Sequence, residues 1–257
     1  MKRLLFLSLF AILFNGHSEI KAQIIVVEAR QLTDTASGFS GNVDLNFNFN
    51  SNTTKSLSGG LGSEMYYAWK KNRLISINKY NALLNIDDAE NAAVNQGYQH
   101  LRYTYDFNYK YTGALFSQIQ TNPVLRIQQR FLLGGGPRFN VQPYGVNSLM
   151  FGTMLMYEYE KELDTAIVHS DVRASIYLFY KIKLGKNLSA NSVTYYQPRI
   201  DQLNDFRIST SIDFSVSIND KINWMLLSNL LYDSFPVSDP GIPNLTYSIQ
   251  NALNFKF

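Results

Sequence analysis

Apolar and polar residues alternate one by one along unusually long segments of this chain. Within residues 99–111 the odd positions after 100 are apolar or aromatic, and the even positions are polar or charged. The same pattern recurs in residues 42–50, 206–218 and 244–257. Because successive side chains of a β-strand point to opposite faces, each segment predicts a strand with one apolar and one polar face.

Weaker alternation fills the intervals between these four segments and raises the number of predicted strands to twelve. The further segments are residues 55–70, 73–85, 114–122, 127–141, 146–160, 168–184, 188–198 and 222–233. Transmembrane β-strands need about 9–11 residues each, and bacterial single-chain membrane barrels have an even number of strands. The pattern therefore predicts an all-β fold, namely an antiparallel transmembrane β-barrel of about 12 strands.

The predicted connections alternate between two kinds. Every second connection carries a tight turn signal, at Lys71-Asn72, Thr112-Gly113, Gln142-Pro143, Gly185-Lys186 and Asn219-Asp220. The others include the longer and more polar segments 86–96, 160–167, 199–205 and 234–243. Outer-membrane barrels have short periplasmic turns and longer outer loops. We therefore expect both termini in the periplasm and the longer segments outside the cell.

A secreted β-sandwich or lipocalin-like barrel, with its apolar faces turned inward, is the alternative fold. Strands that alternate over twelve or more residues argue against it, because soluble strands are typically about five or six residues long. The charged fraction of 17% is also low against the roughly 25% of soluble domains. The side on which the apolar faces lie, outside or inside, separates the two folds.

The N-terminus has the pattern of a cleavable secretory signal. A short basic start and an apolar run at 4–14 precede a cleavage point at Ala22-Gln23. We expect residues 1–23 to be the signal peptide and residues 24–257 to be the barrel.

The mature chain is nearly neutral. Cleavage removes three basic residues and one acidic residue from totals of 23 and 20, which leaves 20 and 19. This balance gives no electrostatic reason to expect nucleic acid as a partner. The chain has no cysteine, which excludes disulfides, thiolate metal sites and a cysteine nucleophile.

The polar faces of the predicted strands carry charges of both signs, which is typical of a wet lumen. The residues expected to face the lumen are Glu64, His100, Arg102, Asp106, Lys110, Arg130, Arg138, Glu158, Arg173, Lys181, Arg207 and Asp213. Opposite charges in a narrow space tend to pair, since an unpaired buried charge costs roughly several kcal/mol. We therefore expect a partly plugged lumen.

No motif predicts a catalytic site, a cofactor or a metal ion. A lipid hydrolase or protease would need His100 or His169 as its base, and we expect His100 to be a hydrogen-bonding residue of the lumen. The acidic segment 87–90 is expected to be a solvated outer loop rather than a Ca²⁺ site. The Gly-Gly-Gly-Pro run at 134–137 lacks the helix of a phosphate loop, so we expect the glycines to mark a kink or a close backbone approach within a strand, and Pro137 to lie at a bulge.

Three segments carry a family resemblance. They are RFLLGGGP at 130–137, YYQPR at 195–199 with NDFR at 204–207, and a terminal strand that ends in Phe257. The chain resembles the uncharacterised family of outer-membrane β-barrels that includes salt-stress-induced outer-membrane proteins, and it is similar to Bacteroidota members. The resemblance implies that Phe257 is the assembly signal for the barrel-assembly machinery. It implies no established activity.

The resulting hypothesis is a non-enzymatic barrel in the outer membrane of a Gram-negative bacterium, surrounded by lipid. It is either a narrow passive pore or a sealed barrel related to envelope stress. One alternative is an outer-membrane hydrolase acting on lipid or surface polymer. Another is a receptor that binds an external ligand through residues 86–96 and 234–243.

Overall fold

Twelve antiparallel strands form a single sheet in the computed structural model, which describes residues 37–51, 55–85, 93–142, 147–219, 222–237 and 242–255. The strands are β1 (Gly38–Ser51), β2 (Lys55–Trp69), β3 (Asn72–Asn85), β4 (Ala93–Asp106), β5 (Tyr111–Asn122), β6 (Ile127–Gln142), β7 (Ser148–Glu162), β8 (Val168–Lys183), β9 (Leu188–Pro198), β10 (Phe206–Ser217), β11 (Ile222–Asp233) and β12 (Leu245–Phe255). The order of the strands in the sheet is their order in the chain. A short 3-10 helix, η1 (Pro123–Leu125), lies between β5 and β6.

The predicted all-β fold is confirmed, and each of the twelve predicted strands is present with a length of 11–16 residues. The largest difference concerns β4, which begins six residues earlier and ends five residues earlier than predicted, so that residues 93–96 of the expected outer loop 86–96 belong to the strand. Residues 107–110 form a turn in which the side chain of Asn108 accepts hydrogen bonds from the backbone N–H of Lys110 and Tyr111 at 2.8 and 3.0 Å. The turn predicted at 112–113 is therefore wrong, because apolar residues continue the period of two through an Asx turn.

The connections divide the sheet into two ends. The turn end holds the connections β2–β3, β4–β5, β6–β7, β8–β9 and β10–β11, none of which exceeds five residues. The loop end holds the other six, among them residues 199–205 and 234–244. The expected signal peptide, the acidic segment 87–90 and Phe257 lie outside the described residues.

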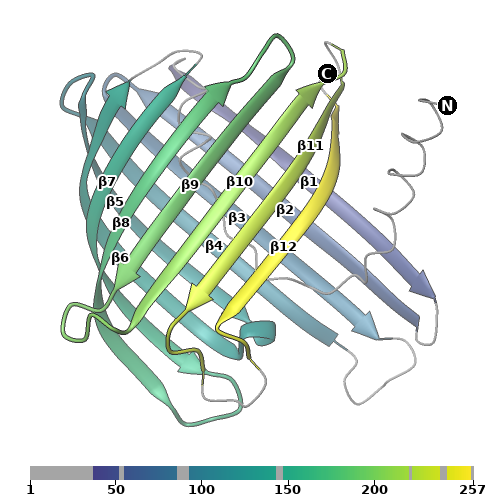
Figure 1. The fold of residues 1–257 in the computed structure, drawn as a ribbon. Coiled ribbons are helices and arrows are strands. Elements are labelled where there is room, and N and C mark those ends of the chain that lie inside the picture. Colours follow the sequence, from purple (N-terminus) through teal and green to yellow (C-terminus); the bar gives the residue numbers. More distant parts are fainter. Residues whose placement is uncertain are drawn as a thin grey trace, which may run out of the picture.

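The sheet is curved and twisted, so that β9–β12 cross in front of β1–β4 in the view of Figure 1. The strand order begins at β1 and ends at β12, and within the described residues no strand pairing joins these two. The sheet is therefore open along this edge. Among the same residues, no helix is long and apolar enough to cross a membrane.

The two faces of the sheet differ in polarity. On β7, every second residue from Ser148 to Glu162 is buried, and the residues between them are half-buried or exposed. The buried positions of the sheet include many charged and polar side chains, such as Glu158 and Arg173 at 2% exposure. Large apolar side chains such as Leu115 (62%) and Leu155 (60%) are exposed. The apolar faces thus lie outside, in contrast to the secreted alternative.

The concave face also carries an apolar cluster, which the sequence pattern did not predict. Its buried members are Ala114, Phe116, Leu132, Met150, Met154, Met156, Tyr177, Phe179 and Val193. Gly134 makes room for it, since a Cβ there would lie 2.8 Å from Phe116 and from Met156. The close backbone approach expected of the glycines is present, because a Cβ at Gly136 would lie 2.2 Å from the Thr153 carbonyl oxygen of β7. Pro137 pairs with Gly113 without a shift of register, so the bulge expected there is wrong.

Candidate functional site

A cavity of about 470 Å³ lies on the concave side of the sheet, towards the loop end. Charged residues of β7, β8, β10 and β11 line its wall, and the apolar cluster lines its deeper part. Residues of the β11–β12 connection, including Phe235 and Pro243, line its outer part. The cavity therefore has a charged side, an apolar floor and a rim made by a loop.

The charged wall arises from the period of two on adjacent strands. Glu158, Glu160 and Glu162 occupy successive inward positions of β7 and are 2–3% exposed. On β8, Asp171 is the register partner of Glu158, and Arg173 follows as the next inward residue. An unpaired carboxylate at this degree of burial would be strongly destabilising. Arginines on other strands pair with Glu158 and Glu160.

Arg207 of β10 is the centre of this wall. Its Nη1 donates to both carboxylate oxygens of Glu158 at 2.8 Å, and its Nε donates to Asp233 of β11 at 2.8 Å. Its Nη2 lies 3.5 Å from a carboxylate oxygen of Glu160, which also pairs with Arg130 of β6. One guanidinium thus joins strands that lie far apart in the sequence.

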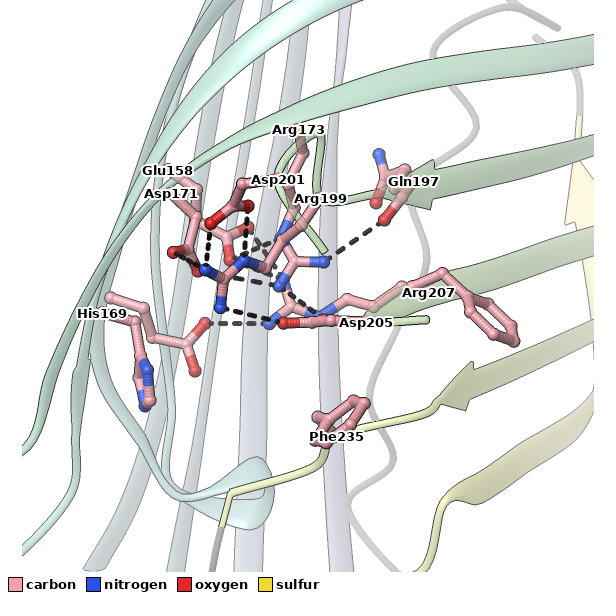
Figure 2. Close-up of polar contacts among 12 residues, drawn as sticks. Glu158, His169, Asp171, Arg173, Gln197, Arg199, Asp201, Asp205, Arg207 and Phe235 are labelled. Atoms are coloured by element: carbon pink, nitrogen blue, oxygen red, sulfur yellow. Dashed lines mark hydrogen bonds and ion pairs between the residues drawn. The ribbon is translucent and has the colours of Figure 1, made fainter. Parts of the chain in front are cut away.

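Two further arginines extend the network to the β9–β10 connection (Figure 2). Arg173 donates to Glu158 at 3.3 Å and to Asp205 at 3.0 Å. Arg199 donates to Asp201 at 2.7 Å and to Asp205 at 3.4 Å. The hydrogen bond from Arg199 holds the pKa of Asp201 below its usual range, and the same bond raises the pKa of Arg199. The connection is thereby fixed to the cavity wall.

We call these groups the charge network. It consists of Arg130, Arg173, Arg199, Arg207, Glu158, Glu160, Asp171, Asp201, Asp205 and Asp233. Four guanidinium groups face six carboxylates, so the charge network has a formal charge of −2. Beside it, His169 contacts Glu162 at 2.8 Å at the loop end of β8.

Aromatic rings of β4 and β5 line the deeper part of the cavity. His100 lies between Tyr98 and Phe116, with ring centroids 6.2 and 5.5 Å apart. The guanidinium of Arg102 lies 5.8 Å from the centre of the Phe116 ring. The Nδ1 of His100 contacts the side-chain oxygen of Gln118 at 3.2 Å. In a catalytic triad, a carboxylate contacts the Nδ1 of the histidine. At His100 the side-chain amide of Gln118 occupies that position.

The structure brings half of the expected lumen residues together at the cavity. Those that line it are His100, Arg102, Arg130, Glu158, Arg173 and Arg207. Glu64 and Arg138 are also buried at 2% exposure but lie outside the lining.

The remaining expected lumen residues lie elsewhere. Asp106 pairs with Arg73 and accepts a hydrogen bond from Thr112 at 2.8 Å. Lys181 and Asp213 are half-buried on the inward positions of their strands. Lys110 is exposed in the turn at 107–110, so its expected inward orientation is wrong. The early end of β4 is the reason.

Sequence reasoning missed several members of the charge network. Glu160, Asp171, Arg199, Asp205 and Asp233 lie at strand ends or in connections that were expected to be outer loops. The sequence of β7 could have predicted one of them, because the alternation of polar residues continues from Glu158 through Glu160 and Glu162. The ion pairs between strands that are not neighbours, such as Arg207 of β10 and Glu158 of β7, depend on the curvature of the sheet, which no local pattern encodes.

The comparison with family models places the chain in a family of unknown function. A family model described as "Protein of unknown function, DUF481" matches residues 38–248. No curated protein and no solved structure matches the chain. The matched span begins with β1 and reaches into β12, so it covers nearly the whole sheet.

Proposed function

Because the chain belongs to the DUF481 family, whose description names no activity, we propose its function from its own geometry. The protein is a non-enzymatic barrel of the Gram-negative outer membrane. On this proposal the sheet closes between β1 and β12 in the membrane, and the barrel is sealed against ions and open to the outside through the cavity at its loop end. The observation that carries this proposal is the inverted polarity of the sheet, with charged residues buried and large apolar residues exposed.

The exposed apolar surface supports a lipid environment. Leu115, Leu133 and Leu155 lie at the middle of β5, β6 and β7 and are 54–62% exposed. Monomeric soluble proteins rarely expose apolar patches larger than about a few hundred Å², whereas the lipid face of a barrel is apolar throughout. Aromatic residues gather near the turn end, where Tyr67 stacks on Trp69 at 5.1 Å, as in an interfacial girdle.

The packing beyond the cavity supports a sealed barrel. Towards the turn end, Met150 and Phe179 follow the cavity floor on β7 and β8, do not line the cavity, and are 2% and 0% exposed. On the opposite strands, Ser211 and Ser248 are 2% exposed. Side chains therefore fill the concave space on both sides, as they do in small barrels.

Single-channel recording of the refolded mature chain in a planar bilayer tests this proposal. Insertion is established first, from protection of the strands against protease in lipid vesicles. We expect the inserted protein to give no discrete conductance steps, while a general porin in the same bilayer gives them. Steps from the inserted protein would favour the narrow passive pore instead. Failure to insert would contradict the membrane assignment itself.

A matched variant tests whether the apolar cluster is the reason for the absence of conductance steps. Replacing Phe116 and Met154 together by serine removes two large side chains from the apolar cluster while leaving the charge network intact. If this cluster seals the barrel, the double variant conducts where the natural protein does not. An equally silent double variant would place the seal elsewhere.

A further inference from the structure

We propose that the cavity binds an organic cation with an apolar body, such as a quaternary ammonium compound. Its charged head would lie against the carboxylates of the charge network, and its body against the apolar floor. This inference rests on the proposed function, because it takes the loop end as the side from which a ligand enters.

The charge network favours a cation over an anion. Arg173, Arg199 and Arg207 each face three carboxylates within 4.0 Å. An incoming anion would have to displace one of these partners. A cation instead enters a cavity lined by five arginines and six carboxylates, which gives its lining a formal charge of −1 with the histidines neutral, and in which carboxylates already share arginines. In a poorly hydrated site this imbalance attracts positive charge more strongly than in water.

The apolar floor favours a cation with an apolar body over a hydrated metal ion. Phe116, Met154, Met156 and Tyr177 line the deeper part of the cavity and are 1–8% exposed. Aromatic faces stabilise organic cations, and apolar side chains replace the water that such cations bind only weakly. Among the described residues, no group of three or more His, Cys, Asp or Glu side chains is arranged to hold a metal ion.

A partly exposed carboxylate lies at the loop end of the cavity. Asp233, at the end of β11, lines the cavity with 17% of its side chain exposed. The neighbouring Ser234 is fixed to the β9–β10 connection, because its hydroxyl donates to the Asn204 carbonyl at 3.0 Å and accepts from the Phe206 N–H at 2.8 Å. The carboxylate of Asp233 is therefore held at the entrance and is accessible to a ligand.

Equilibrium dialysis of the full mature barrel in lipid nanodiscs tests the proposal, with empty nanodiscs as the blank. The probe is benzyltrimethylammonium, and its uncharged isostere neopentylbenzene and the anion phenylacetate are the comparison compounds. We expect saturable binding of the cation alone. No binding above the blank, or equal binding of the neutral isostere, would overturn the inference.

Two substitutions locate the binding site. Asp233→Asn removes a carboxylate from the cavity and is expected to weaken cation binding by about fivefold to tenfold. Asp164→Asn is the control, because Asp164 pairs with Arg126 at 3.0 Å on the exposed surface and does not line the cavity. Equal effects of the two substitutions would overturn the assignment to this cavity.

A cavity-filling variant tests the site without changing its charge. Ser209 lines the cavity on β10 beside Tyr195 of β9, and Ser209→Phe is expected to abolish saturable binding. Insertion of every variant is checked by the protease protection described above. A barrel that inserts but binds no cation would overturn this inference and leave the proposed function standing.

Discussion

The ring of Tyr177 on β8 lies directly over Gly152 on β7. The two residues are register partners, and a Cβ at Gly152 would lie 2.3 Å from the Tyr177 ring. Tyr177 is 1% exposed, belongs to the apolar cluster and lines the cavity. The absence of a side chain at position 152 therefore makes room for the Tyr177 ring in the cavity floor.

The first prediction follows from this contact. Gly152→Ala forces the Tyr177 ring out of its position, and we expect a loss of about 1–3 kcal/mol in the free energy of unfolding, measured by urea titration in lipid vesicles. The additional substitution Tyr177→Leu should recover much of this loss. Gly185→Ala is the control, because nothing lies within 4 Å of a Cβ at that position. Similar losses at both glycines would contradict the steric explanation.

The second prediction tests which solvent covers the convex face. Leu155 is 60% exposed at the middle of β7, and Leu155→Arg is expected to cost about 2–4 kcal/mol or to block insertion, as charges do on the lipid face of barrels. Leu184→Arg, in the β8–β9 turn, is expected to be tolerated, although Leu184 is also 53% exposed. The measurement is the yield and urea stability of inserted barrel. Equal tolerance would point to water on both faces.

The third prediction concerns the charge network. Arg207→Ala leaves Glu158, which is 2% exposed, with the longer contact of 3.3 Å to Arg173 in place of two of 2.8 Å, and we expect a loss of roughly 3–5 kcal/mol. Adding Glu158→Gln should recover part of the loss, because the less well compensated buried charge is then removed.

The exposed pair of Arg126 and Asp164 provides the comparison. Arg126→Ala breaks an ion pair of 3.0 Å at the surface and is expected to cost less than about 1 kcal/mol. Both variants are compared with the natural chain by urea titration in lipid vesicles. A small effect of Arg207→Ala would mean that the cavity wall is well hydrated rather than buried.

The strands of this protein could be predicted from sequence because each carries its own alternation. Tyr111 shows the limit of this signal, since it continues the period of β4 although it is the first residue of β5. Period alone does not mark a turn whose residues are also apolar. The side-chain amide of Asn108 decides that turn.

The candidate site could be predicted only in part. Inward charges such as Glu158 and Arg207 follow from the alternation, but their pairing joins residues 49 positions apart. The contribution of Asp205 and Asp233 depends on where β10 begins and β11 ends, and strand ends are the least regular part of the pattern. The apolar floor also escaped prediction, because Met154 and Tyr177 occupy positions that the pattern marks as polar-facing.

The last prediction concerns the β9–β10 connection, which the charge network ties to the cavity. The pKa of Asp201 is held below its usual range chiefly by the hydrogen bond from Arg199. A carboxyl whose pKa is lower in the folded state contributes stability above its unfolded pKa and loses it as the pH falls through the folded value. We therefore expect the contact between Arg199 and Asp201 to persist at neutral pH and to be lost only in strongly acidic solution. NMR titration of the side-chain carboxyl carbon measures this directly.

Substitution of the partner gives the decisive comparison. Arg199→Gln removes the charged donor, so the pKa of Asp201 should rise towards its usual range. Arg126→Gln, which changes an arginine outside the charge network, should leave the Asp201 titration unchanged. If Arg199→Gln also leaves it unchanged, another group holds the Asp201 carboxylate.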